Sequence, residues 1–221
     1  WLVLGAISAV LAWMTWLGAR GITLAESPPH AGHANFHSQA HVPLLLGYGA
    51  FGAGYICYVT FMYAHLRELG ADETALTAFW CIIGGSTMLS VWLWACVLER
   101  LKRAYAFSLL SVIVTVGAAI PLFSDRIDLA FLSAAVFGSA LFSVPASTTV
   151  FVRRNFVAEQ WPRALGILTV SFGVGQIIGP TLAGYVSDQS GALSHGLAWG
   201  CIFLLAGAAV ALLQSDPAVD A

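Results

Sequence analysis

Residues 163–188 read R-A-L-G-I-L-T-V-S-F-G-V-G-Q-I-I-G-P-T-L-A-G-Y-V-S-D, and this stretch decides the fold. It is apolar over a length that suffices to cross a bilayer as a helix. It also contains Pro180 and several glycines, which a helix selected only for stability in water would avoid. We therefore expect a transmembrane helix that is built for close contact with its neighbours.

The composition places the whole chain in lipid. Of its 221 residues, 59% are hydrophobic and 9% are charged, and the mean hydropathy is +0.83. A water-soluble protein of this size would need far more polar surface, so the expected surroundings are a lipid bilayer. The net charge of −2 argues against a nucleic-acid partner, which would require a basic face.

Segments of about 20 residues recur that are apolar enough to span the ~30 Å hydrocarbon core of a membrane. We expect seven such spans, at residues 1–19, 42–66, 75–98, 104–123, 129–152, 164–186 and 193–213. Their connections are short except for residues 20–41, a polar linker that contains Pro28 and Pro29. The predicted protein is all-α, with a first helix at 1–19, the linker at 20–41 and a six-helix bundle at 42–221.

The lysines and arginines predict the orientation. Alternate loops hold seven of them, whereas the opposite loops hold only Arg67 and Arg126. Because positive residues favour the cytoplasmic side, we expect the N-terminus outside and both the linker and the C-terminus in the cytoplasm. The seven are Arg20, Arg100, Lys102, Arg103, Arg153, Arg154 and Arg163.

The glycines of the sixth span form a small-xxx-small pattern. Gly175 and Gly179 lie four residues apart, so a neighbouring backbone can approach closely, and Pro180 removes a backbone donor beside them. Simple helix packing explains this spacing as well as a moving contact does. The order of parts is more specific: a basic entry, a glycine-rich middle with the polar Gln176, and a terminal S-D.

That order resembles the eleventh helix of major facilitator superfamily transporters. A second stretch, A-C-V-L-E-R-L-K-R at residues 95–103, is similar to the cytoplasmic loop pattern G-x-L-x-D-R-x-G-R-R of that family. Glu99 occupies its acidic position, and Arg100 and Arg103 occupy basic ones, whereas Ala95 and Lys102 stand where the pattern has glycine. A third stretch, P-L-L-L-G-Y-G-A-F-G-A-G-Y-I at residues 43–56, resembles the seventh helix of the YbfB/YjiJ-type branch.

The resemblance implies that this chain is the C-terminal half of a transporter together with the sixth helix. Its expected partner is the N-terminal six-helix half of the same transporter, and its expected location is a bacterial inner membrane. Two such bundles surround one central cavity and expose it to each side in turn. The chain begins at Trp1 rather than Met, so we expect it to start in the middle of something longer.

The resemblance also indicates which helices face that cavity. In the second span, aromatic residues recur every three or four positions and share one helix face, and Gln176 in the sixth span needs a neighbour or a ligand for its amide. The fifth span adds serines four residues apart and Pro145, which can free backbone carbonyls. Core or interfacial packing, and serine bonds to the own helix, are the alternatives. The expected cavity residues are Tyr48, Phe51, Tyr55, Tyr58, Ser139, Ser143 and Gln176, and the expected packing and hinge residues are Gly52, Pro145, Gly175, Gly179, Pro180 and Gly184.

Charged residues are missing from the middle of the last six spans. If transport is coupled to protons, we therefore expect the titrating carboxylate in the other half, because intramembrane charges mark ion pathways. His65 is the nearest titratable residue here, and we interpret it as an interfacial histidine at the outer end of its span. The linker histidines His30, His33, His37 and His41 would share one face of a helix, but we favour solvated histidines and expect no metal or cofactor.

Three classes of function compete. A secondary transporter of a small solute explains the helix count, loop charges and glycine pattern together. A seven-helix receptor shares the topology, but the last span lacks a lysine that could carry retinal. A membrane scaffold within a complex of other subunits could use the same fold. We expect no enzyme, because the sequence contains no nucleophile with a base, no carboxylate pair and no ligand cluster.

Overall fold

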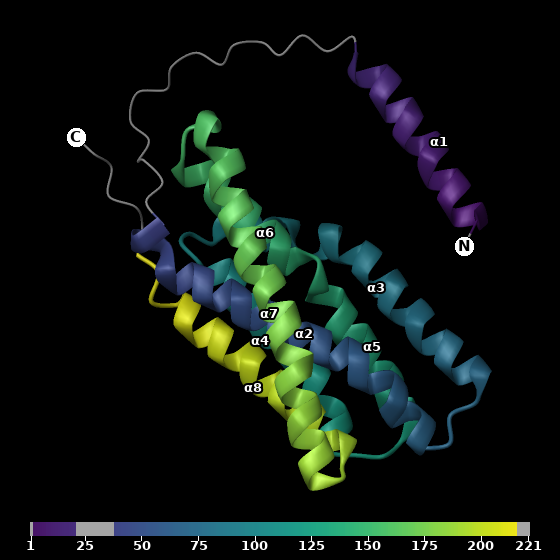
Figure 1. The fold of residues 1–221 in the computed structure, drawn as a ribbon. Coiled ribbons are helices and arrows are strands. Elements are labelled where there is room, and N and C mark those ends of the chain that lie inside the picture. Colours follow the sequence, from purple (N-terminus) through teal and green to yellow (C-terminus); the bar gives the residue numbers. More distant parts are fainter. Residues whose placement is uncertain (1, 21–37, 216–221) are drawn as a thin grey trace. The chain divides into compact units, whose positions relative to one another are not determined.

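The computed structural model describes residues 2–20 and 38–215, and these residues form helices and no strand (Figure 1). The chain divides into two compact units, residues 1–31 and 32–221. The first unit contains α1, Leu2–Ala19, at the position of the first predicted span. Its sequence is almost entirely apolar, as expected of a helix surrounded by lipid.

The second unit contains six spans that are long and apolar enough to cross a membrane, when α5 and α6 count as one. The predicted class of an all-α membrane protein, with six spans after the linker, is therefore confirmed. The helices are η1 Ser38–His41, α2 Val42–Glu68, α3 Glu73–Arg100, α4 Tyr105–Ala119, η2 Ile120–Leu122, α5 Ile127–Leu141, α6 Ser143–Asn155, η3 Ala158–Gln160, α7 Trp161–Ser190 and α8 Leu193–Ala211.

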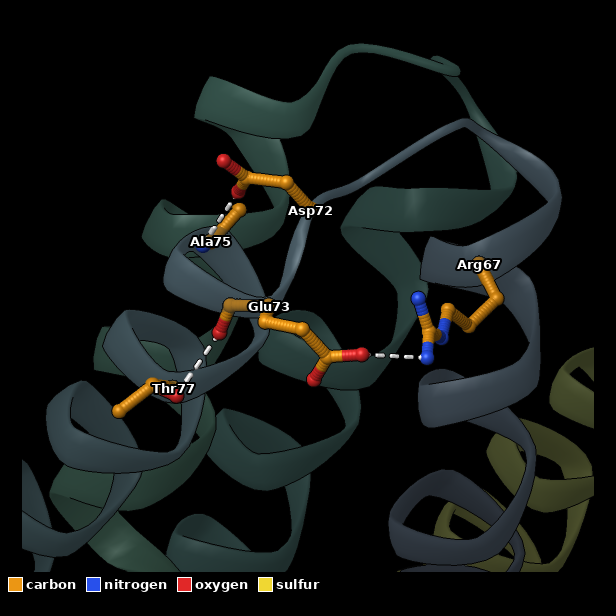
Figure 2. Close-up of polar contacts among 5 residues, drawn as sticks. All are labelled: Arg67, Asp72, Glu73, Ala75 and Thr77. Carbon is orange, nitrogen blue, oxygen red and sulfur yellow. Dashed lines mark hydrogen bonds and ion pairs between the residues drawn. The ribbon is translucent and has the colours of Figure 1, made fainter.

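Local polar contacts define the turn between α2 and α3 (Figure 2). The Asp72 carboxylate accepts a hydrogen bond of 2.8 Å from the Ala75 backbone N–H, which caps the free donors at the start of α3. Arg67 at the end of α2 forms an ion pair of 2.5 Å with Glu73. These contacts fix where one membrane helix ends and the next begins.

The fifth predicted span is two helices rather than one. The span expected over residues 129–152, with Pro145 able to break its hydrogen-bond ladder, is interrupted at Phe142, so that α5 ends at Leu141 and α6 begins at Ser143. Pro145 explains the position, because a proline cannot donate to the carbonyl four residues earlier, and its ring clashes there. That carbonyl belongs to Leu141, the last residue of α5.

α2 is the central helix of the second unit. It packs extensively on α8 and α7, while α4 packs on α5 and α8, and α3 packs on α5. α3 and α7 are the least buried of the six spans. In the most apolar 18 residues of each, 17% of the residues are buried, against 39% to 56% in the other spans. Their exposed side chains are apolar, as Trp92 and Ile177 show, so these two helices present their faces to lipid or to further helices.

Candidate functional site

The contact between α2 and α7 is made backbone to backbone. A side chain at Gly175 would overlap the carbonyl oxygen of Gly49, and one at Gly179 would overlap the carbonyl oxygen of Ala53. Both glycines are buried. Gly175 and Gly179 therefore form the small-residue contact that their spacing predicts, and the neighbour they approach is α2.

The other glycines of α7 lie elsewhere on the helix. Around Gly166 and Gly173 no heavy atom of the described chain would meet an added Cβ, and at Gly184 the nearest atom is Phe61 Cζ at 3.9 Å. The expected packing role of Gly184 is thus an ordinary van der Waals contact. Pro180 stands inside α7 next to Gly179, as predicted.

Four aromatic rings gather where α2 faces the middle of α7. The ring of Phe172 lies 4.8 Å from that of Tyr48 and 5.4 Å from that of Tyr55, and both pairs are stacked. Phe51 stacks on Tyr55 at 5.6 Å. Gly52 makes the arrangement possible, because any side chain there would overlap the Phe172 carbonyl oxygen.

Gln176 continues this cluster one turn along α7. Its Nε2 atom donates to the Tyr55 hydroxyl, so the expected partner for the amide is a tyrosine from the predicted aromatic face. Both side chains are half-buried. The structure thus unites Tyr48, Phe51, Tyr55 and Gln176, and it adds Phe172. The signal for Phe172 was its position four residues before Gln176, on the same helix face.

Tyr58 does not join this cluster. Its side chain is 1% exposed, and its hydroxyl shares a hydrogen bond of 2.6 Å with Ser133 Oγ of α5. Ser133 in turn donates to the Gly117 carbonyl of α4 at 2.7 Å. Tyr58 also stacks on Phe137 at 4.1 Å. The helix-face argument grouped Tyr58 with Tyr55, but Tyr58 lies in the core between α2, α4 and α5.

The serines of the fifth span use their hydroxyls within the bundle. Ser139 donates to the Val136 carbonyl of its own helix at 2.7 Å, and Ser143 donates across to the Ser90 carbonyl of α3 at 3.2 Å. The backbone carbonyl of Ser139 accepts from Trp94 Nε1 of α3 at 2.6 Å. α3 thus bonds to the α5–α6 span on both sides of the interruption at Phe142.

An arginine of α6 forms hydrogen bonds with the loop between α3 and α4. Arg154 donates to the backbone carbonyls of Glu99 and Leu101, at 2.6 and 2.9 Å. The Glu99 carboxylate takes no part in these two bonds. The backbone of Arg103 is left-handed, at φ 53°. The residue before it, Lys102, stands at the glycine position of the family pattern. Glu99, Arg100, Lys102, Arg103 and Arg154 line a cavity of about 330 Å³ at this loop.

Two histidines of the sequence analysis are described by the structure. His65 is buried at the end of α2, with 6% exposure, and its Nε2 atom has no hydrogen-bond partner among the described residues. His41 is buried beside Phe156, and its Nδ1 atom lies 3.0 Å from Gln214 Nε2. His30, His33 and His37 lie outside the described residues.

The aromatic cluster with Gln176 suits a neutral solute. Its members carry no charge, its rings offer flat surfaces for stacking, and the amide and the tyrosine hydroxyl supply a donor and acceptors. Tyr55, Phe172 and Gln176 are half-buried, whereas Tyr48 and Phe51 are buried against them, at 7% and 1% exposure. Binding sites typically combine such apolar walls with a few polar groups. We therefore treat Tyr48, Phe51, Tyr55, Phe172 and Gln176 as the candidate site.

Comparison with known proteins adds one finding. A family model described as "Uncharacterised MFS-type transporter YbfB" matches residues 1–212. The match covers α1 and all six spans of the second unit. The curated proteins contain no match to the chain.

Proposed function

Because this chain belongs to the family of MFS-type transporters described by YbfB, we propose that it moves a small solute across a membrane by secondary active transport. The six apolar spans and the family together support a transporter over the seven-helix receptor. The alternative function, a membrane scaffold, can be distinguished by experiment, because a scaffold would move no solute across the membrane.

Alternating access is the proposed mechanism. The bundle of residues 42–213 rocks against a partner bundle, which we propose to be the N-terminal half of the same transporter. The interruption at Phe142 and the proline in α7 give the bundle two places where helices can bend. Gly175 and Gly179 keep α7 against α2 during that motion.

The substrate is proposed to be a neutral solute with a planar or aromatic part. The observation that carries this proposal is the stacked cluster of Tyr48, Tyr55 and Phe172 with Gln176 bonded at its edge. A planar solute can stack on the half-buried rings of Tyr55 and Phe172, and it can exchange hydrogen bonds with the amide that now bonds Tyr55.

Protons are the proposed coupling ion. Acidic and basic side chains of the six spans lie at or near helix ends, so the proposed coupling carboxylate belongs to the partner bundle. The basic loops at residues 100–103 and 153–163 support the proposal that this end of the bundle, and with it the C-terminus, lies in the cytoplasm of a bacterial cell.

Thermal unfolding of the purified protein with a library of neutral aromatic solutes tests the site. We expect a solute that raises the unfolding temperature to be taken up by proteoliposomes when an inward proton gradient is imposed. Gln176→Ala and Tyr55→Phe should weaken its binding by about tenfold, because each removes one polar contact worth roughly 1.4 kcal/mol.

Tyr58→Phe is the matched control, because Tyr58 lies in the core and bonds Ser133. It should lower stability and leave solute affinity unchanged. Equal losses of affinity in the Tyr55 and Tyr58 variants would contradict the site. A solute that binds but is never transported, under any gradient, would contradict the transporter and support the scaffold.

A further inference from the structure

An apolar groove of about 470 Å³ lies between α4 and α8, and none of the residues that line it belongs to the candidate site. Its wall from α4 includes Tyr105, Ser108 and Leu109, and its wall from α8 includes Leu205, Ala209 and Leu212. The three leucines are exposed. In a membrane protein, an exposed groove of this chemistry faces the acyl chains of lipids.

One polar atom in the groove has no partner. Ser108 is 4% exposed, and its hydroxyl makes no hydrogen bond within the described part of the chain. A buried hydroxyl without a partner costs free energy, and serines inside helices commonly bond back to their own backbone instead. Ser108 lines the groove, so a molecule in the groove can supply the missing acceptor.

The mouth of the groove is basic. Leu101 lines the groove, and the next two residues, Lys102 and Arg103, line the charged cavity at the same loop. Arg103 reaches back to the groove, since its Nη1 atom donates to the Tyr105 hydroxyl at 3.4 Å. The cavity has four basic residues, Arg100, Lys102, Arg103 and Arg154, and one acidic residue, Glu99. The loop therefore favours an anion.

We propose that this groove binds a phospholipid with an anionic headgroup. One acyl chain lies between α4 and α8, and the phosphate lies at Lys102 and Arg103. Ser108 is one turn beyond Tyr105, about 4.5 Å deeper along the helix axis, and donates to an ester carbonyl of the lipid. The occupant thus meets the apolar walls, the unpartnered hydroxyl and the positive loop together.

Native mass spectrometry of the purified protein with dioleoyl phosphatidylglycerol tests the acyl-chain part. Ala209→Trp fills the groove, and Ala206→Trp is the control, because Ala206 is exposed on the same helix outside the groove. We expect at least a fivefold loss of bound lipid in the first variant and none in the second. Equal binding in the two variants would overturn the proposal.

Charge-neutralised variants test the headgroup part. The variant Lys102→Gln with Arg103→Gln should lose the preference for phosphatidylglycerol over dioleoyl phosphatidylcholine. The control, Arg67→Gln with Arg126→Gln, removes the same charge at the other end of the bundle and should keep that preference. Loss in both variants, or in neither, would overturn the headgroup assignment. A dimer that Ala209→Trp dissociates would show that a second copy covers the groove and would also overturn the proposal.

Discussion

Gln176 of α7 donates a hydrogen bond to the Tyr55 hydroxyl of α2, and the two residues thereby link the helices that also touch backbone to backbone at Gly175 and Gly49. A transporter site must be both held in place and free to exchange partners. A side-chain contact beside a rigid backbone contact meets both needs. In the proposed mechanism, the bond opens for a solute while the glycines keep the helices together.

A double-mutant cycle on Tyr55 and Gln176 measures this bond. We expect Tyr55→Phe to lower the free energy of unfolding in the parent protein, because it leaves a half-buried amide without its acceptor. In the Gln176→Leu background the same change should cost less, by about 0.6 kcal/mol, the usual size of such bonds in membrane proteins. Reversible unfolding in mixed micelles gives the four values. Additive effects would contradict a direct contact.

The glycines of α7 should respond to substitution according to their neighbours. Gly179→Ala should destabilise the bundle by about 1–3 kcal/mol, because the new methyl group meets the Ala53 backbone. Gly173→Ala should be neutral or stabilising, since space is open there and alanine favours the helix by about 1 kcal/mol.

Thermal unfolding of both variants in detergent distinguishes these outcomes. The larger change Gly179→Leu should also abolish uptake while the protein still inserts into the membrane. Equal melting temperatures for Gly179→Ala and Gly173→Ala, or unchanged uptake kinetics in Gly179→Leu, would show that close approach at Gly179 is unimportant.

The parts of the fold that follow from local chemistry could be predicted. Apolar length predicts seven spans, and the described residues contain the last six of them as helices long enough to cross a membrane. The spacing of Gly175 and Gly179 predicts a close helix contact, and Pro145 predicts a broken ladder in the fifth span. The neighbours could not be predicted, because helical periodicity gives a face but not what lies against it. Tyr58 shows this: one turn after Tyr55, it meets Ser133 and the core.

The loop between α3 and α4 is a second place where the sequence does not identify the atoms in contact. The resemblance of residues 95–103 to the family's loop pattern implies a charge latch between helices, with Glu99 as its acidic residue. Arg154, from a helix some fifty residues further along the chain, instead bonds the backbone carbonyls of Glu99 and Leu101. A backbone acceptor leaves no signature in the sequence, since every residue has one.

Variants of this loop separate the two descriptions. Arg154→Gln should raise amide hydrogen exchange across residues 99–104 by about tenfold, because the last carbonyls of α3 lose their donor. Glu99→Gln should leave exchange unchanged, since the carboxylate takes no part in these bonds. Arg153→Gln is the control, because Arg153 lies over the Trp161 ring, 4.9 Å from its centroid. Faster exchange in Glu99→Gln would instead support the side-chain latch.

The ion pairs at the opposite end of the bundle bear on how the protein enters the membrane. Arg67 pairs with Glu73 and Arg126 pairs with Asp128, and each pair lies within six residues of chain. A loop that carries such a pair has no net charge from it, so the electric potential does no net work when the loop crosses. The loops of Arg100 and Arg154 also contain acids, Glu99 and Glu159, but each loop holds three basic residues and keeps a positive net charge. The net charge of the loops and the count of their arginines and lysines therefore favour the same orientation in the membrane.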